Sequence, residues 1–496
     1  MIELPFGVPM WFRAILVLVL VVLVSAGALA QKSPNIILIL TDDQGYGDVG
    51  CHGHPYLKTP NIDRLHAEST RLTDYHVSPT CSPTRSALMS GRVPFKNGVT
   101  HTILERERMA LSSTTIAEAL RATGYTTGIF GKWHLGDEEP YQPHNRGFDE
   151  AFIHGGGGIG QKYPGSCADA PPNIHNRYYD PVIRHNGTFV KTKGYCTDVF
   201  FRHAMGWIHS RKEKPFFAYI STNAPHGPFI CPPAFQAPYN KRSKQQKTAA
   251  FYGMIANIDH NVGLLMKGLK DWGIDRETLV IFMTDNGSAR GDFSAGMRGA
   301  KGSIHQGGAR VPAFFRWPGR ITAGRDVTNL TRHVDVFPTL LSVAGAKPGA
   351  GLDGRNLMPL LTDQTLFWSD RLTVFHTGRW GKPKLDGRWG GKGVESGKYS
   401  KFAVRNERFR LVGRDSLFDI DRDPGEKLNI IDKHPAVARR MLAAYELWWE
   451  EVQPMLVNEN VPLSKTHPFI DLYDKQKASA GIPKWVPLPL SGRKTK

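Results

Sequence analysis

Cysteine and long apolar segments are scarce in this sequence of 496 residues. It has five cysteines, and after residue 30 no apolar run reaches the length of a helix that spans a bilayer. The sequence also lacks zinc-finger cysteine spacing, heptad repeats and an aromatic RNA-binding signature. These absences argue against a multi-span membrane protein, a coiled coil and a zinc-finger protein.

The composition is that of a globular protein with an excess of positive charge. Hydrophobic residues make up 41% and charged residues 22% of the chain, and 63 basic against 45 acidic residues give a formal charge of +18. In an exported protein this excess favours a sulfated or uronate-rich polysaccharide, or an anionic membrane face, over nucleic acid. Solubility alone is the other explanation. We expect no nucleic-acid partner.

The first 30 residues have the pattern of a secretory signal peptide. An apolar run over residues 14–24 follows Arg13, and the small residues Ala28 and Ala30 precede Gln31. An uncleaved membrane anchor is the alternative, because the segment up to Ala30 approaches the span of a bilayer. We expect cleavage and export to a periplasm or the exterior (in a eukaryote, a lysosome or the extracellular space), with no stable membrane insertion afterwards.

Short apolar runs alternate with helical segments over most of the chain. The expected strands cover residues 36–40, 126–130, 215–221 and 279–284, and the expected helices cover residues 62–69, 115–123, 197–211 and 248–272. Apolar runs without polar alternation are typical of buried parallel strands. The pattern predicts an α/β fold with a large, mostly parallel sheet sandwiched by helices.

The pattern changes after about residue 361. Short strands are expected at residues 372–375, 402–404, 409–412 and 417–420, followed by an amphipathic helix over residues 435–452. This order is typical of a small antiparallel sheet with a helix. We therefore expect a large α/β domain over residues 31–365 and a smaller C-terminal α+β subdomain over residues 366–496.

Side chains with oxygen atoms follow two of the expected buried strands. Asp42 and Asp43 come after the first, and Asp285 and Asn286 come after the fourth. In open α/β sheets, ligands bind beyond the carboxyl ends of the strands. Oxygen ligands suit calcium or magnesium rather than zinc. A shared divalent cation is the prediction, and solvated loop carboxylates are the alternative.

Cys81 is expected at the N-terminus of a helix. In Cys81-Ser-Pro-Thr-Arg85, Ser82 suits the N-cap and Pro83 suits the first helical position, while Gly91 ends the segment. The helix dipole stabilises anions at this end and lowers the pKa of a thiol. Half of a structural disulfide is the alternative for such a cysteine.

The odd number of cysteines leaves at least one thiol without an intramolecular partner. With Cys81 set aside, Cys51, Cys167, Cys196 and Cys231 allow three pairings. The most local of these joins Cys167 to Cys196, and it is the disulfide that we expect.

The segment at Cys81 resembles the C-x-P-x-R core of the type I sulfatases, the arylsulfatase-like, formylglycine-dependent enzymes of the alkaline phosphatase superfamily. Further family motifs follow in chain order: Thr41-Asp42-Asp43, Gly131-Lys132-Trp133-His134, Ala224-Pro225-His226, Thr284-Asp285-Asn286-Gly287, and Lys301 within Gly-Ala-Lys-Gly-Ser. The likeness covers roughly residues 35–320 and continues weakly to the end of the chain. We find no departure from the motif set.

The resemblance implies a sulfuric ester hydrolase that uses one calcium ion. It implies that Cys81 is oxidised to formylglycine (3-oxoalanine) by a formylglycine-generating enzyme. The hydrated aldehyde would attack sulfur, expel the alcohol and then collapse to release sulfate. The implied metal ligands are Asp42, Asp43, Cys81, Asp285 and Asn286.

The same resemblance implies roles for the basic side chains. Arg85 would help to activate the nucleophile, and Lys132 and Lys301 would neutralise the sulfuryl and leaving oxygens. His226 would donate a proton to the departing alcohol, while His134 would orient the hydrate and assist its collapse.

Two other functions are compatible with these residues. A phosphodiester or phosphonate ester hydrolase of the same superfamily would use the same nucleophile and metal. A secreted polyanion-binding protein that has lost its activity is a hypothesis of another class. For a sulfatase, the excess of positive charge favours a sulfated saccharide as the natural substrate, and an activated aryl sulfate should also be hydrolysed in vitro.

Overall fold

The computed structural model describes most of the chain after the N-terminal segment. The described residues are 33–102, 107–159, 178–241, 246–347, 349–362, 368–379, 382–383, 389–390, 397–456 and 466–490. Residues 34–496 form one compact unit. The predicted signal peptide at residues 1–30 lies outside the described residues, as does Cys167.

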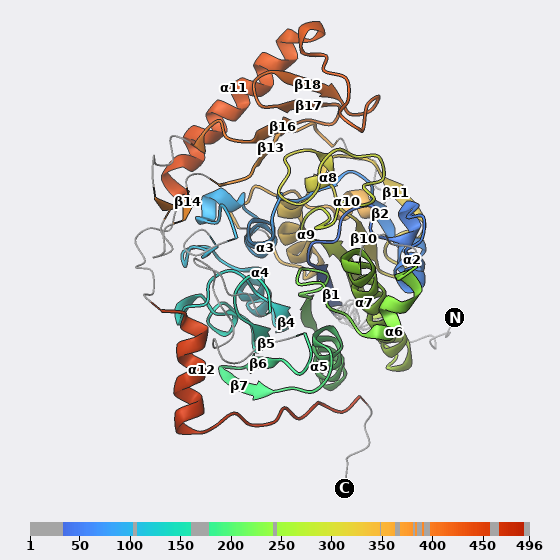
Figure 1. The fold of residues 1–496 in the computed structure, drawn as a ribbon, viewed down its shortest axis with the longest axis vertical. Coiled ribbons are helices and arrows are strands. Elements are labelled where there is room, and N and C mark those ends of the chain that lie inside the picture. Colours follow the sequence, from blue (N-terminus) through green and yellow to red (C-terminus); the bar gives the residue numbers. More distant parts are fainter. Residues whose placement is uncertain are drawn as a thin grey trace, which may run out of the picture. The chain divides into compact units, whose positions relative to one another are not determined.

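A sheet of ten strands forms the centre of the protein (Figure 1). In spatial order its strands are β11 (Arg325–Val327), β2 (Thr70–Leu72), β10 (Ala313–Arg316), β9 (Thr278–Thr284), β1 (Asn35–Thr41), β8 (Phe216–Ser221), β4 (Thr126–Lys132), β5 (Glu150–His154), β6 (Val182–His185) and β7 (Thr188–Lys191). The five strands from β9 to β5 are parallel, and β10, β6 and β7 pair with their neighbours in antiparallel fashion. The predicted large, mostly parallel sheet is confirmed.

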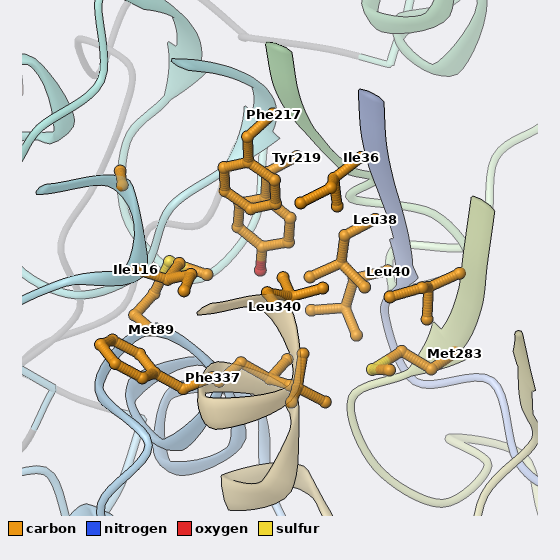
Figure 2. Close-up of a cluster of buried hydrophobic side chains, with 14 of the residues drawn as sticks. Ile36, Leu38, Leu40, Met89, Ile116, Phe217, Tyr219, Met283, Phe337 and Leu340 are labelled. Atoms are coloured by element: carbon orange, nitrogen blue, oxygen red, sulfur yellow. The ribbon is translucent and has the colours of Figure 1, made fainter. Parts of the chain in front are cut away.

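Helices cover both faces of this sheet. They are α2 (Pro60–Ala67), α3 (Cys81–Ser90), α4 (Ile116–Arg121), α5 (Cys196–Arg211), α7 (Gln246–Asp271) and α9 (Val336–Val343). All seven residues of β1 are buried, and its side chains alternate between two cores. Ile36, Leu38 and Leu40 pack with residues of α3, α4 and α9 (Figure 2), whereas Ile37 and Ile39 pack with residues of α2, α5 and α7. This two-sided burial explains why the strand has no polar alternation.

A second, antiparallel sheet has four strands in the order β13 (Thr373–His376), β16 (Phe402–Arg405), β17 (Phe409–Val412) and β18 (Ser416–Asp419). Helix α11 (Pro435–Val452) has the predicted bounds and packs on it through Met441, Tyr445 and Trp449. Trp448 contacts Phe95 of the large part of the protein, with ring centroids 5.2 Å apart. The small sheet is therefore held to the large part by aromatic packing.

The last described helix, α12 (Pro468–Ser479), lies beside the large sheet and not beside the small one (Figure 1). Phe469 joins the core on the α3 side of the large sheet, and Gln476 exchanges hydrogen bonds of 2.6 and 2.9 Å with the backbone of Phe189 in β7. The sequence assigned this segment to the subdomain at residues 366–496. The domain limits near residue 365 remain a prediction, and α12 falls outside the small sheet that motivated them.

The remaining elements are short. They are β3 (Tyr75–His76), β12 (Thr331–Arg332), β14 (Lys382–Pro383), β15 (Trp389–Gly390), α6 (Pro233–Gln236), α8 (Gln306–Ala309), α10 (Met358–Leu361), and 3₁₀ turns at Gly50–His52, Pro94–Asn97, Glu139–Tyr141, Pro143–Asn145, Ala237–Tyr239, Asp275–Glu277, His333–Asp335, Ile431–Lys433 and Gln453–Met455. Among the described residues, no helix is both long enough and apolar enough to cross a membrane.

The expected disulfide is not supported by the structure. Cys51, Cys196 and Cys231 all carry free thiols, and so does Cys81. The expected partner of Cys196, Cys167, lies outside the described residues. No disulfide occurs in the part of the chain that the structure describes. Burial in apolar surroundings accounts for Cys196, which is fully buried in the core on the α5 side of the sheet.

Gly131 sets the spacing between β4 and β8 at the end of the sheet. Its φ is +116°, and a Cβ at this position would lie 1.9 Å from the carbonyl oxygen of Ser221. Gly124, which precedes the same strand, also has a positive φ of +89°, but a Cβ there would meet nothing within 4 Å.

We predict that Gly131→Ala lowers the free energy of unfolding by about 3 kcal/mol or more, because the two strands must move apart. Gly124→Ala carries only the conformational cost, about 1 kcal/mol, and is the matched control. Urea unfolding of both variants measures the difference. Equal losses would show that Gly131 does not set the strand spacing.

Candidate active site

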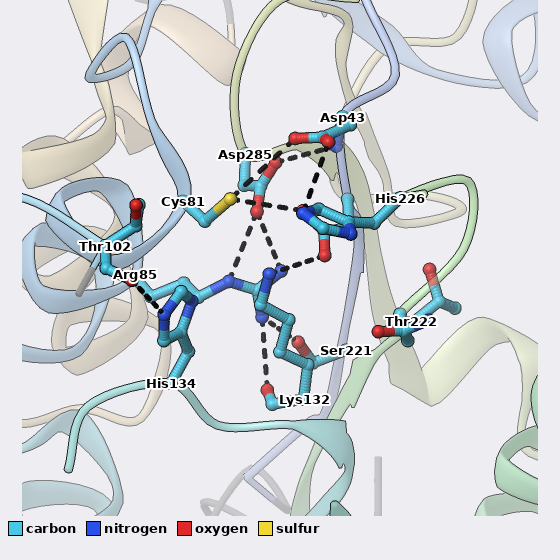
Figure 3. Close-up of polar contacts among 12 residues, drawn as sticks. Asp43, Cys81, Arg85, Thr102, Lys132, His134, Ser221, Thr222, His226 and Asp285 are labelled. Carbon is cyan, nitrogen blue, oxygen red and sulfur yellow. Dashed lines mark hydrogen bonds and ion pairs between the residues drawn. The ribbon is translucent and has the colours of Figure 1, made fainter. Parts of the chain in front are cut away.

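Four neighbouring parallel strands, β9, β1, β8 and β4, end at the same edge of the large sheet. Polar side chains at or just after their ends lie close together (Figure 3). Asp42 and Asp43 follow β1, and Asp285 and Asn286 follow β9. Lys132 is the last residue of β4. The predicted crevice at the carboxyl ends of the strands therefore contains the side chains that sequence analysis selected.

Cys81 lies at the centre of this group. Its Sγ is 3.4 Å from Oδ1 of Asp42 and 3.7 Å from Oδ1 of Asp43, and the side chain is 1% exposed. Helix α3 begins at Cys81 with Thr80 as its N-cap, two residues earlier than the predicted start with Ser82 as the cap. The sulfur thus lies in the first turn, where the positive end of the helix dipole favours negative charge.

Arg85, one turn further along α3, connects three strand ends. Its Nε and Nη2 donate to Oδ2 of Asp285 at 3.2 and 2.8 Å, and its Nη1 donates to the carbonyl oxygen of Lys132 at 3.1 Å and to the hydroxyl of Ser221. All ten residues of α3 are buried. A guanidinium that is buried away from solvent needs hydrogen-bond acceptors from the protein. Here the acceptors lie at the ends of β9, β4 and β8.

Two lysines neutralise the carboxylates that follow β1. Lys132 Nζ lies 2.6 Å from Oδ2 of Asp42, with both side chains fully buried. Lys301 Nζ lies 2.7 Å from Oδ2 of Asp43. The Lys301 side chain is 27% exposed and that of His226 is 14% exposed, whereas the other predicted site residues are buried. The site therefore opens to solvent on the side of Lys301 and His226.

The two predicted histidines have different hydrogen-bond environments. His226 Nδ1 donates to the carbonyl of Gly227 at 2.6 Å, so its Nε2, 3.7 Å from Oδ2 of Asp43, faces the carboxylates. His134 Nε2 lies 3.1 Å from the carbonyl of Thr102 and 3.0 Å from Oε2 of Glu107. Both of those partners are acceptors, so Nε2 carries the proton and the buried Nδ1, which has no hydrogen-bond partner, presents a lone pair.

Two site residues have left-handed backbone conformations. Asp43 has φ of +66° and His134 has φ of +60°, values that residues with a Cβ adopt at a cost. Each residue follows a buried strand closely, so the turn takes the chain sharply away from the sheet. Non-glycine residues in this conformation occur preferentially at functional sites.

Burial and neighbouring charges shift the titration of the site. Burial, followed by the Asp285 carboxylate, raises the pKa of Asp42 well above its ordinary value. Burial also opposes ionisation of Asp43, but the charges of Lys301, His226 and Lys132 together outweigh it and lower the pKa of that carboxyl. Burial and the Asp42 carboxylate raise the pKa of the Cys81 thiol. Burial and the charge of Lys301 lower the pKa of His226 to about 3. A further positive charge beside the carboxylates, such as a metal ion, would therefore stabilise their ionised forms.

The carboxylates and the sulfur form a compact group of potential ligands. Ligand atoms of Asp42, Asp43, Cys81 and Asp285 all lie within 4.8 Å of one another. Asn286 Nδ2 donates to Oδ1 of Asp43 at 2.9 Å, which leaves its Oδ1 buried without a partner. Carboxylate oxygens together with an amide oxygen that lacks a hydrogen-bond partner are suitable ligands for a hard divalent cation such as calcium or magnesium.

Sequence analysis missed three groups that support the site. Ser221 binds Arg85, and Glu107 and the carbonyl of Thr102 bind the ring of His134. Ser221 ends a strand that was predicted, so its position beside the site could have been found from the parallel order. Glu107 lies in a segment without regular secondary structure, and no sequence pattern connects it to His134.

Known proteins resemble this chain in sequence over most of its length. A family model described as Sulfatase matches residues 34–346, and one described as N-sulphoglucosamine sulphohydrolase, C-terminal, matches residues 300–444. Arylsulfatase A of Homo sapiens is 32% identical over 450 residues, which cover 83% of this chain and 86% of that protein. N-acetylgalactosamine-6-sulfatase of Canis lupus familiaris is 34% identical over 391 residues, 72% of either chain.

Solved structures also share the fold. The crystal structure of Ps i-CgsB in complex with k-i-k-neocarrahexaose has a TM-score of 0.73 and 31% identity, and the match covers 84% of this chain and 93% of that chain. The phosphonate monoester hydrolase of Agrobacterium radiobacter has a TM-score of 0.61 at 20% identity, a likeness of fold alone. Motifs, fold and relatives lead to one conclusion: the chain belongs to the sulfatase family and is a type I sulfatase, a sulfuric ester hydrolase.

Proposed function

We propose that this protein hydrolyses the sulfate esters of a saccharide through a formylglycine formed from Cys81, with calcium bound beside it. The observation that carries the proposal is the position of Cys81, buried between the carboxylates that follow β1 and at the N-terminus of α3. Burial and these carboxylates favour the protonated thiol, which is a poor nucleophile. An oxygen nucleophile at this position removes that difficulty.

Asp42, Asp43, Asp285 and Asn286 would hold the calcium ion, together with the side chain at position 81. When they are present, the hydrated formylglycine supplies an oxygen nucleophile and the cation offsets negative charge on the sulfuryl group. The unpartnered Oδ1 of Asn286 supports this assignment because a buried amide oxygen needs a partner. Calcium suits a loose set of carboxylate and amide oxygens better than magnesium does.

The chain's own cations would bind the charged sulfate group. Lys132 and Arg85 hold positive charge at the buried end of the site, and Lys301 does so at its open end. Preorganised charges of this kind stabilise the transition state without reorganisation. Lys301, which is partly exposed, would contact the sulfuryl and leaving oxygens.

His226 and His134 would move protons on the two sides of the reaction. His226 would donate from Nε2 to the departing alcohol, and the negative charge of a bound sulfate ester would offset the effects of burial and Lys301 on its pKa. The lone pair on Nδ1 of His134 would accept a proton from the hydroxyl at position 81. Glu107 and the Thr102 carbonyl support that role because they hold the proton on Nε2.

The saccharide substrate is inferred from relatives and charge. Names of similar proteins include an N-acetylgalactosamine-6-sulfatase, and Ps i-CgsB is seen with k-i-k-neocarrahexaose. A formal charge of +18 suits an anionic polymer. Export of the protein, with removal of residues 1–30, belongs to the same proposal.

Peptide mass spectrometry of the active protein should show that the side chain at position 81 has lost its sulfur. Cys81→Ala should lower turnover of an aryl sulfate by roughly a thousandfold or more, because the nucleophile is removed. Cys231→Ala, which also removes a buried free thiol, is the control and should keep most of the activity. Fully active protein with an intact thiol at position 81 would refute the formylglycine mechanism.

Calcium should stabilise the folded protein. At about 100 times its dissociation constant, a bound ligand adds about 2.7 kcal/mol. Thermal melts of chelated protein should therefore shift upward with calcium, and less with magnesium. Asn286→Leu should reduce the calcium-dependent shift, because it removes one oxygen ligand. A full shift in this variant would exclude Asn286 as a ligand.

The loss of turnover in His226→Ala should depend on the leaving group and should be largest for esters whose alcohol leaves poorly. Loss of a general acid costs about 10² to 10⁴ in rate. We expect losses in this range for alkyl or sugar sulfates and a much smaller loss for an activated aryl sulfate, whose alcohol leaves without protonation. His144→Ala is the control, since His144 is partly exposed and binds Glu139. Equal losses on both ester types would rule out proton donation by His226.

A further inference from the structure

A cavity of about 450 Å³ lies at the open side of the active site. Its described lining residues come from both the large part of the protein and the small sheet with its connections: Thr80, His101, Thr102, Lys301, Gly302, Thr377, Arg379, Ser400 and Lys401. We propose that this cavity binds a second anionic group of the substrate, a sulfate or a carboxylate on the saccharide next to the ester that is cleaved. This inference rests on the proposed function.

Three contacts connect the cavity to the catalytic residues. Thr80 is the N-cap of α3 and directly precedes Cys81. Lys301 Nζ is 2.7 Å from Oδ2 of Asp43. The carbonyl of Thr102 binds the ring of His134. A group in the cavity is therefore next to a sulfate ester positioned at Cys81.

The cavity is lined by positive charge. Lys301, Arg379 and Lys401 contribute cations, and none of its described lining residues is acidic. Lys301 is already neutralised by Asp43. Lys401 is exposed and forms no ion pair with any described residue, so its charge is available to a ligand. Hydroxyl groups of Thr80, Thr377 and Ser400 add hydrogen-bond donors, which anions also require.

The backbone holds these cations at the cavity. Gly378, next to Arg379, has φ of +62°, and a Cβ there would lie 1.7 Å from the carbonyl oxygen of Thr100. The segment can therefore pack closely beside His101 and Thr102. The amide of Thr377 donates to the carbonyl of Lys401 at 3.3 Å, and Lys401 has φ of +53°. A lysine in this costly conformation, beside a cavity, is consistent with a binding role.

The position and the charge together identify the ligand class. Lys132, Arg85 and the proposed calcium ion serve the sulfate group that is cleaved, so Arg379 and Lys401 are additional to what one ester needs. Lys401, which forms no ion pair with a described residue, supplies a charge for the second anion, and the guanidinium of Arg379 adds to the positive charge of the lining. Saccharides with two neighbouring anionic groups would therefore bind better than those with one.

Binding to the Cys81→Ser variant tests the inference without turnover. The ligands are a disaccharide with one sulfate ester, its counterpart with a second sulfate on the neighbouring position, and a counterpart with a uronate carboxylate there. Calorimetry should show that a second anion improves affinity roughly tenfold, the order expected for one charge-assisted contact. The better of the two dianionic ligands identifies the group that the cavity prefers.

Arg379→Ala and Lys401→Ala, each combined with Cys81→Ser, should reduce the ratio of the affinities for dianionic and monoanionic ligands toward one. Arg379→Lys should retain part of it. Lys267→Ala removes an exposed cation of α7 that pairs with Asp271 and should leave the preference intact. Absence of any preference for the second anion, or a preference that survives both alanine variants, would overturn the inference.

The proposed function is tested separately by hydrolysis of an aryl sulfate by the unaltered protein. If the protein cleaves the aryl sulfate but shows no preference for dianions, the proposed function is supported and the cavity assignment is refuted. A protein that binds dianions selectively but cleaves no sulfate ester would support the cavity and refute the proposed function.

Discussion

The compensation of buried charge is the constraint on which this active site depends. Three carboxylates, of Asp42, Asp43 and Asp285, lie in a region that excludes most solvent, and Lys132, Lys301 and Arg85 each pair with one of them. An unpaired charge in such a place costs several kcal/mol, whereas a paired and hydrogen-bonded one is tolerated. The pairs tie β1, β4, β9 and α3 to one another, so the same contacts support both the fold and the chemistry.

The arrangement also separates a buried end of the site from an open end. Lys132, Arg85 and Asp285 are without solvent contact, while Lys301 and His226 are partly exposed. A substrate entering from the open end would meet Lys301 and His226 first and the buried charges last. In the proposed function, the sulfate group would therefore bind deepest, with the alcohol directed toward the cavity.

The sequence predicted the large sheet and the site because both depend on local signals. Apolar runs such as residues 36–40 are typical of strands buried on both faces, and β1 is one. Parallel order then places Asp42 and Asp285 at one edge without any knowledge of loops. The start of α3 was misplaced by two residues, since the N-cap is Thr80 and its side chain makes no capping bond. Specific roles for the histidines came from the family resemblance and not from spacing.

Contacts between distant segments could not be predicted. Phe469 of α12 packs on the large sheet although it follows the small sheet in the chain, and Glu107 reaches His134 from an irregular segment. The expected Cys167–Cys196 disulfide was wrongly inferred from proximity in sequence, because the apolar surroundings of Cys196 were not visible there. The cavity combines Thr80 with Lys401, residues that only the tertiary fold brings together.

The complete burial of α3 has a consequence for the biogenesis of the protein. Cys81 is 1% exposed, and every residue of its helix is enclosed. If Cys81 is oxidised by another enzyme, as proposed, that enzyme must reach a side chain that the folded protein encloses, so the modification must come before the fold closes. Maturation and folding would then compete in time. A chain that closes too early would be stable, correctly shaped and permanently inert.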